Sequence, residues 1–326
     1  MDGGFLSTTA CTAIVGGATT LLVLGRLLRL LLGTNGRMNM QGKHCLITGG
    51  SSGIGKEVAK QLVRQGAHVT VLARRQGALD AAMMDIKACR FSPSQMVQTV
   101  SVDVSDFKAV EKATSEAVAK QGPVQILVNC AGFAIAQELD EMKMEDFERI
   151  LRVNTLGTAF VTRALLPGMK AAGGGRILMT SSMAGQQTGI YGYCAYSASK
   201  FALVGMAQAL QMEVKAFGIG VSVAYPPDTD TPGYVKENEG KPAATHLIEE
   251  GAGLFSPAQA REREKKYLVA LKMVRGLEKG DFCITFGFEG YLVGLATAGF
   301  SPCFSLLDAT LQVREGGREG GSQLSK

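Results

Sequence analysis

The chain has 326 residues, of which 46% are hydrophobic and 19% are charged, and its formal net charge is +5. A disordered chain would need low hydrophobicity and high net charge, so this composition excludes disorder of the whole chain. The seven cysteines form no Cys-x-x-Cys pair and the three histidines are not clustered with them, so we expect neither a disulfide-stapled miniprotein nor a metal site. The modest positive charge does not indicate a nucleic-acid partner.

An uncharged, leucine-rich run opens the chain. Residues 3–25 carry no charged side chain, and Arg26 and Arg29 follow them. Such a run can cross a hydrocarbon core, which needs about 20 residues. Positive charge after it favours a cytosolic location for the rest of the chain, whereas a cleaved signal peptide would carry its charge before the run. We expect residues 1–36 to form a membrane anchor with a basic flank; the alternative is an amphipathic segment on the membrane surface.

From residue 42 onwards, short apolar runs alternate with segments of helical periodicity. The pattern predicts strands at 44–47, 69–73, 96–102, 126–128, 176–180 and 220–225. It predicts helices at 56–65, 77–89, 108–121, 143–151, 158–171 and 196–217. Because the strands are continuous apolar runs, both faces of the sheet should be buried. We therefore expect an α/β fold, a doubly wound parallel sheet (Rossmann fold), over residues 37–289.

A glycine-rich loop follows the first expected strand and precedes a helix. Gly49 permits a sharp turn, while Gly53 and Gly55 let the backbone approach a pyrophosphate and let the helix pack on the strand. The helix N-terminus would offer N–H groups to the phosphates. This order predicts a dinucleotide site, the alternative being a tight glycine turn without a ligand. The residues expected to bind the cofactor are Gly49, Ser51, Ser52, Gly53, Ile54 and Gly55.

Two arginines, Arg74 and Arg75, follow the second expected strand. An NAD site favours an Asp or Glu there for the ribose 2′-hydroxyl, and no acid occurs before Asp80. An arginine fork matches a 2′-phosphate, which an acidic side chain would repel. We expect NADPH/NADP+ as the cofactor, with Arg74 the better candidate because it directly follows the apolar run. The alternative is that both arginines lie solvated at the sheet edge.

The ends of the third and fourth strands supply the other expected cofactor contacts. Asp103 is placed to accept a hydrogen bond from the adenine amino group. Its alternative role is to cap the next helix, for which Ser105 and Asp106 are also available. The residues expected to wall the cofactor on the other side are Asn129, Ala131 and Gly132.

Tyr196 and Lys200 are four residues apart at the start of the longest expected helix, so they share one face. A tyrosine with a pKa near 10 is a poor acid at neutral pH, and a nearby ammonium lowers that pKa. Such a tyrosine can give a proton to a carbonyl oxygen as a hydride reaches the carbon. Ser182, at the end of the fifth strand, is placed to hold that oxygen.

Together these motifs resemble the short-chain dehydrogenase/reductase family over about residues 42–235. The resemblance rests on Thr48, Gly53, Gly55, Asn129, Ala131, Gly132, Asn154, Ser182, Tyr196 and Lys200. It implies that Tyr196 is the acid/base, that Lys200 lowers its pKa and binds the nicotinamide ribose, that Ser182 positions the carbonyl and that Asn154 supports a proton relay through water. There are two departures. Cys130 replaces a second asparagine, and the spacing from Ser182 to Tyr196 is one residue longer than usual, which leaves Ser181 as an alternative.

Four segments are similar to one group in that family, the 3-ketodihydrosphingosine (3-dehydrosphinganine) reductases: residues 49–56, 195–202, 209–215 and 223–233. That resemblance implies NADPH-dependent reduction of 3-ketosphinganine to sphinganine on the cytosolic face of the endoplasmic reticulum membrane. Tethering would raise the encounter rate with such a lipid. We expect Pro226 to end the sixth strand and Thr229 and Thr231 to reach the nicotinamide or diphosphate. A substrate lid is expected at 233–254.

The last third of the chain has weaker signals. We expect a charged, solvated helix at 260–271 and a strand at 282–288. Residues 290–307 carry no charge, and they form either a membrane-embedded or re-entrant hairpin or a packed, lipid-facing segment. Residues 314–326 are glycine-rich and polar, and are expected to be disordered. We therefore expect residues 290–326 to form an apolar membrane-associated segment and a disordered tail.

Two alternatives to this function stay open. One is a membrane-bound reductase of the same family that acts on a steroid, retinoid or fatty acyl ketone. The other is a membrane-attached sensor of NADP(H) without turnover, against which the set of Ser182, Tyr196 and Lys200 argues. The family resemblance also makes a homodimer possible, through the helices around Thr158 and Ala202.

Overall fold

The computed structural model describes residues 37–186, 190–246, 265–287 and 290, and those from Met38 onwards lie in one compact unit. Their strands form a seven-stranded sheet in the order β3-β2-β1-β4-β5-β6-β7, in which every neighbouring pair is parallel. The strands are β1 (His44–Thr48), β2 (His68–Ala73), β3 (Val97–Ser101), β4 (Ile126–Asn129), β5 (Gly175–Thr180), β6 (Ile219–Ala224) and β7 (Cys283–Ile284). The strand order reverses between β1 and β4, which is where such sheets bind ligands.

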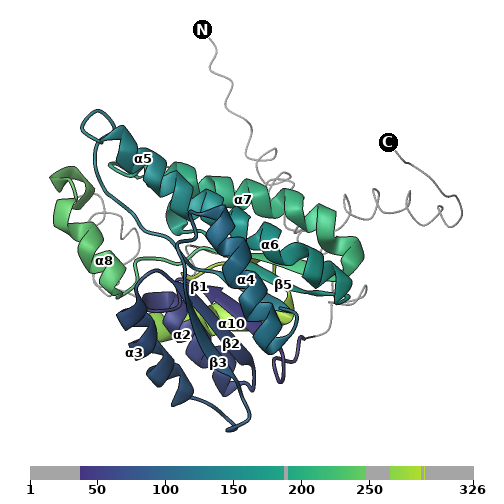
Figure 1. The fold of residues 1–326 in the computed structure, drawn as a ribbon. Helices are drawn as coiled ribbons and strands as arrows, with labels where there is room; N and C mark the ends of the chain where they lie inside the picture. Colours follow the sequence, from purple (N-terminus) through teal and green to yellow (C-terminus); the bar gives the residue numbers. More distant parts are fainter. Residues whose placement is uncertain (1–36, 187–189, 247–264, 288–289, 291–326) are drawn as a thin grey trace, which may run out of the picture. The chain divides into compact units, whose positions relative to one another are not determined.

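Helices cover both faces of the sheet (Figure 1). One layer contains α2 (Gly53–Arg64), α3 (Gln76–Lys87) and α10 (Lys266–Lys279). The other contains α4 (Phe107–Gln121), α6 (Gly157–Ala171) and α7 (Cys194–Val214), with α5 (Met144–Leu151) packed beside α7. Short helices are η1 (Arg152–Leu156), η2 (Met183–Gly185), η3 (Lys215–Phe217), α8 (Pro232–Glu237) and η4 (Asn238–Gly240). The expected doubly wound fold is confirmed.

The buried strand residues explain why both faces need cover. In β1, Cys45 and Ile47 join the core beneath α2, whereas Leu46 joins the core beneath α6 and α7, and all three are fully buried. Successive side chains of a strand point to opposite faces, so a continuous apolar run requires a layer of helices on each side.

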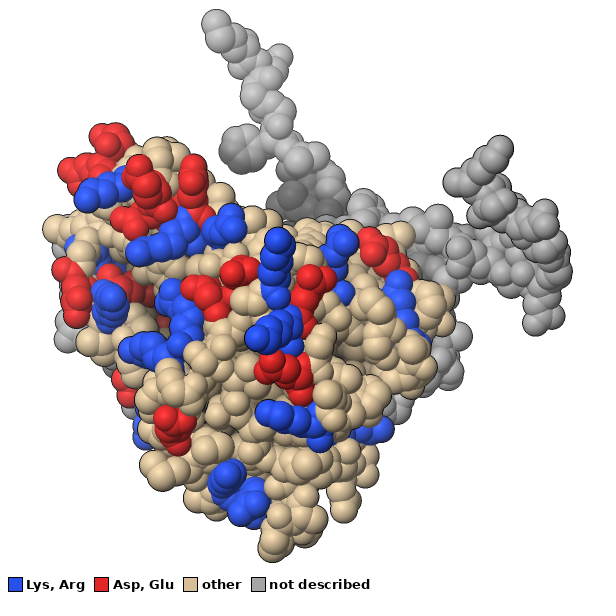
Figure 2. Space-filling view, in the orientation of Figure 1, with Lys and Arg blue, Asp and Glu red and all other residues tan. Residues whose placement is uncertain are grey.

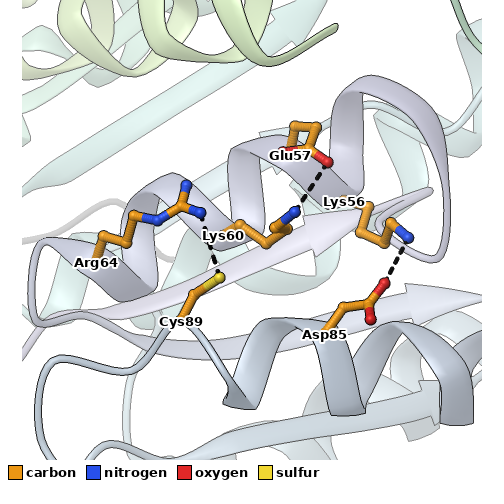
Figure 3. Close-up of polar contacts among 6 residues, drawn as sticks. All are labelled: Lys56, Glu57, Lys60, Arg64, Asp85 and Cys89. Atoms are coloured by element: carbon orange, nitrogen blue, oxygen red, sulfur yellow. Dashed lines mark hydrogen bonds and ion pairs between the residues drawn. The ribbon is translucent and has the colours of Figure 1, made fainter.

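Polar contacts between α2 and α3 lie at the surface of the first layer (Figure 3). Lys56 Nζ pairs with Asp85 Oδ2 at 2.8 Å, and Arg64 donates to Cys89 Sγ at 3.4 Å. Exposed ion pairs contribute about 1 kcal/mol or less, so buried side chains such as Leu62 hold α2 in place. On the face in Figure 2, lysine and arginine side chains lie among aspartate and glutamate side chains.

The helix expected at 260–271 corresponds to α10, which has different bounds and a buried face. Helix α10 begins at Lys266, and its residues Val269, Met273 and Leu277 are fully buried, so the prediction of a solvated helix was wrong. These residues recur every four positions and pack one face of α10 against α2. The charged run at 261–266 precedes this apolar face in the sequence, and residues 260–264 lie outside the described residues. Strand β7 is also shorter than the expected 282–288.

The predicted membrane segments fall mostly outside the described part of the chain. This holds for residues 1–36, for 291–307 and for the tail at 314–326. Among the residues that the structure does describe, no helix combines the length and the apolar composition needed to cross a bilayer.

Candidate active site

The glycine loop lies where β1 ends. Gly49 has a φ of +67°, and a Cβ there would lie 2.8 Å from the Cα of Ala131. A Cβ on Gly55 would lie 2.7 Å from the carbonyl oxygen of Gly49. Thr48 Oγ1 accepts the backbone N–H groups of Cys130 and Ala131, both at 3.1 Å. Only glycines permit these approaches, which lock the loop against the end of β4.

The N-terminus of α2 is arranged to receive an anion. Ser52 is the N-cap residue, and its side chain makes no capping hydrogen bond. Gly53, with a φ of +55°, faces Thr231, because a Cβ there would lie 3.3 Å from Thr231 Cγ2. Thr231 is itself the N-cap of α8 and accepts the N–H of Tyr234 at 3.2 Å. Backbone N–H groups and two hydroxyl side chains thus meet at one loop, and this chemistry fits a diphosphate.

Arg74 and Asp103, both expected to bind the cofactor, contact each other. Arg74 Nη1 lies 3.6 Å from Asp103 Oδ2, and both side chains are exposed. Partial burial acts to raise the pKa of Asp103, but hydrogen bonds from Ser105 and the charge of Arg74 outweigh it and lower that pKa below its usual value. The alternative helix cap is Asp106, which accepts the N–H of Ala109 at 3.1 Å. Arg75 is exposed at the N-terminus of α3.

The residues after β4 divide between the core and the site. Asn129 is buried, and its side chain donates to Thr162 Oγ1 at 3.3 Å, so it faces α6 and not the loop. A Cβ on Gly132, by contrast, would lie 3.0 Å from Asn154 Oδ1 and 3.5 Å from Lys200 Nζ. Cys130 Sγ lies 3.1 Å from Thr180 Oγ1, and burial raises the pKa of this thiol to about 11.

Asn154 lies in η1, a π-helical turn between α5 and α6. It is fully buried: its Oδ1 accepts the N–H of Phe133 at 3.0 Å, and its Nδ2 donates to the carbonyl of Phe133 at 2.9 Å and to Ser199 Oγ at 3.0 Å. The side chain therefore joins the loop after β4 to the first turns of α7. Such π-helical turns often occur at functional sites.

The two serines after β5 have different partners. Ser181 is buried, and its Oγ donates to the carbonyl oxygen of Lys200 at 2.9 Å. Ser182 caps η2, where its Oγ accepts the N–H of Ala184 at 3.2 Å, and its hydroxyl acts on the Tyr196 phenol in the direction that lowers the pKa of that phenol. Ser181 thus ties β5 to α7, whereas Ser182 faces the tyrosine.

Lys200 is buried beside Tyr196. Its Nζ lies 5.4 Å from the centre of the Tyr196 ring and donates to the Thr180 carbonyl at 2.8 Å. Burial lowers the pKa of Lys200 to about 8. The pKa of Tyr196 is raised above its usual value, chiefly by burial and then by the charges of Glu237 and Asp228, against the effect of the Ser182 hydrogen bond. The expected lowering by Lys200 is not seen in this structure, since the pKa of Tyr196 is raised and Lys200 is not among the groups that act on it.

Several neighbours of the site were missed by the sequence reasoning. Gly185 lets η2 pack on α7, since a Cβ there would lie 2.7 Å from Lys200 Cβ. Glu237 and Asp228 act on Tyr196 from the segment after β6, which has no periodicity that could have indicated them.

Thr229, expected at the cofactor, is buried and donates to the Pro227 carbonyl at 2.7 Å. The Pro226 carbonyl accepts the N–H of Met183. No group of three or more His, Cys, Asp or Glu residues in the described ranges could hold a metal.

Comparison with known proteins gives the family. The model of the short chain dehydrogenase family matches residues 43–270. A 3-ketodihydrosphingosine reductase of Bos taurus is 42% identical over 84% of this chain and 80% of its own. A 3-dehydrosphinganine reductase of Danio rerio is 42% identical over 85% of this chain and 80% of its own. The 3-ketodihydrosphingosine reductase of Mus musculus is 42% identical over 84% of this chain and 80% of its own. The chain therefore belongs to the short-chain dehydrogenase/reductase family of nicotinamide-dependent oxidoreductases.

Proposed function

We propose that the protein reduces 3-dehydrosphinganine (3-ketosphinganine), a long-chain α-amino ketone, to sphinganine with NADPH. The observation that carries the proposal is the 42% identity, over most of the chain, to reductases named for this ketone. The meeting of Ser182, Tyr196 and Lys200 at one end of the sheet supports a carbonyl reduction.

Each side chain has a distinct task in the proposed mechanism. Ser182 holds the carbonyl oxygen, and Tyr196 donates its phenolic proton to that oxygen. The raised pKa keeps Tyr196 protonated at neutral pH but also makes it a weaker acid, so proton transfer depends on the ammonium of Lys200 to oppose the effect of burial. Bound NADPH supplies the hydride for the carbonyl carbon. Lys200 binds the nicotinamide ribose, and Asn154 supports the relay that returns a proton to Tyr196.

The loop geometry and the arginines support the choice of cofactor. Gly49, Ser52, Gly53 and Thr231 would hold the diphosphate at the N-terminus of α2. Arg74 is exposed at the end of β2, where its guanidinium can leave Asp103 for a 2′-phosphate at small cost. We further propose that the chain acts at the endoplasmic reticulum membrane through residues 1–36, with the catalytic domain on the cytosolic side.

The test uses the full chain solubilised in detergent. NADPH oxidation is measured with 3-ketosphinganine, and in parallel with NADH and with a steroid ketone. We expect turnover with NADPH and the sphingoid ketone. Turnover of the steroid alone would refute the substrate, and NADPH binding without turnover of either ketone would indicate a sensor.

A tyrosine variant tests the chemistry itself. Tyr196→Phe should bind NADPH normally, as followed by fluorescence, and lose turnover because the proton donor is gone. Tyr267→Phe, on the exposed surface of α10, is the matched control and should keep wild-type turnover. Substantial turnover by Tyr196→Phe would refute the assigned mechanism.

A further inference from the structure

A carboxylate of the segment after β6 lies one aromatic ring away from the proposed catalytic tyrosine. Glu237, the last residue of α8, accepts a hydrogen bond from the hydroxyl of Tyr193. The Tyr193 ring packs on the Tyr196 ring, with the ring centres 5.8 Å apart and the planes at 57°. Glu237 is half-buried, and its charge acts on both Tyr196 and Lys200. The charge of Glu237 thus acts on both proposed catalytic side chains from beyond the Tyr193 ring.

The same corner of the protein already accommodates an ammonium group. Lys241 is buried, and its Nζ lies 5.6 Å from the centre of the Tyr193 ring and 5.0 Å from that of the Tyr234 ring. Tyrosine faces attract cations through the ring quadrupole, and a carboxylate at the ring hydroxyl adds to this attraction. The corner formed by Tyr193, Tyr234 and Glu237 therefore has the chemistry that attracts a primary ammonium, and a substrate ammonium would share it with Lys241.

The proposed substrate carries such a group next to its reacting carbonyl. In an α-amino ketone the ammonium is bonded to the carbon adjacent to the carbonyl carbon. A carbonyl oxygen held by Ser182 and Tyr196 therefore brings the ammonium into the immediate surroundings of Tyr196. We propose that Glu237 binds the ammonium group of the substrate and thereby makes the site specific for α-amino ketones, an inference that rests on the proposed function.

Asp228 is the other carboxylate near Tyr196, and the geometry favours Glu237 over it. Asp228 is exposed and accepts the Tyr234 hydroxyl at 3.1 Å. Its effect on Tyr196 is also smaller than that of Glu237. Glu237 is the residue joined by a hydrogen bond to the ring that packs on Tyr196.

The experiment compares two ketones that differ only in the amine. The full chain in detergent is assayed with NADPH and either 3-ketosphinganine or its 2-deamino analogue, 1-hydroxyoctadecan-3-one. We expect wild type to prefer the amine, and Glu237→Gln to lower kcat/KM for the amine by about 10- to 100-fold, as for loss of a charge-assisted hydrogen bond. Turnover of the deamino ketone should change little. Glu237→Asp keeps the charge and should restore part of the preference.

Control variants separate this role from a structural one. Glu239→Gln removes an exposed carboxylate two residues away and should keep the preference for the amine. An equal loss for both ketones in Glu237→Gln would overturn the proposal and indicate that Glu237 only supports the packing of Tyr193. A selective loss in Asp228→Asn, with none in Glu237→Gln, would also overturn it. Absence of turnover of either ketone by wild type would instead overturn the proposed function itself, and this assignment with it.

Discussion

Arg74 offers the sharpest test of cofactor choice, because its removal should affect binding and leave the fold intact. The guanidinium is exposed, and its partner in the structure is Asp103, at 3.6 Å. Exposed ion pairs contribute about 1 kcal/mol or less to stability. Arg74→Ala should therefore lower the free energy of unfolding by less than about 1 kcal/mol.

The expected loss in cofactor binding is larger. Hydrogen bonds to a charged group contribute about 1.5–3 kcal/mol. Loss of the contacts from Arg74 to a 2′-phosphate should therefore raise the KM for NADPH by about 10- to 150-fold. NADH lacks that phosphate, so its KM should not rise.

Initial rates with each cofactor measure this difference, and a urea unfolding curve measures the stability. Arg64→Ala is the matched control, since Arg64 is a basic residue of α2 whose contact is with Cys89 and not with the predicted site (Figure 3). It should leave both KM values unchanged. Equal rises in KM for NADPH and NADH after Arg74→Ala, or an unchanged KM for NADPH, would refute the assignment of Arg74 to the 2′-phosphate.

Three further predictions concern protonation and packing. Burial lowers the pKa of Lys200 to about 8, so its ammonium loses its proton as pH rises above that value. We expect kcat/KM to fall as pH rises through about 8. Lys200→Arg should remove this fall at alkaline pH. Burial also lowers the pKa of His44 below 6.5, so protons bind preferentially to the unfolded chain and stability is lost as pH falls below about 6.5. Urea unfolding of His44→Gln should show a smaller loss between neutral and acid pH. Leu277→Ala removes a fully buried side chain of α10 and should cost about 2–5 kcal/mol, seen as a lower Tm; an unchanged Tm would contradict the packing of α10 on α2.

The fold was largely predictable because its determinants are local. Strands β1 and β4 are short, fully buried and mainly apolar runs, whereas the edge strand β3 is only half-buried. The strand–glycine–helix order at Gly49 to Gly55 fixes the loop where the chain first reverses direction. The pattern failed at α10, where a charged run precedes the apolar face and only tertiary contact with α2 shows that this face is buried. A local charge pattern cannot reveal which neighbour a helix will pack against.

Residue type and spacing predicted correctly which groups lie together where the position of the backbone alone decides it. Tyr196 and Lys200 share a helix face, and the end of β5 places Ser182 beside them. The side chain of Asn129 shows the limit of such reasoning, because a strand end has two faces and this side chain turns to Thr162. The spacing alone cannot decide between Ser181 and Ser182, and their roles are separated by the hydrogen bond from Ser181 to Lys200 and by the effect of Ser182 on Tyr196.

The charge balance at Tyr196 shows why sequence reasoning stops short of the site's chemistry. From the helix alone, Lys200 at the fourth position should dominate and lower the pKa of the tyrosine. In the fold, Lys200 Nζ donates to Thr180, burial removes water from the phenol, and Glu237 adds a negative charge from a distant part of the chain. These effects favour the neutral phenol, the form that donates a proton to a ketone. Binding of a substrate ammonium at Glu237 would oppose the effect of that negative charge on Tyr196, so the same carboxylate would link recognition of the amine to the acidity of the catalytic tyrosine.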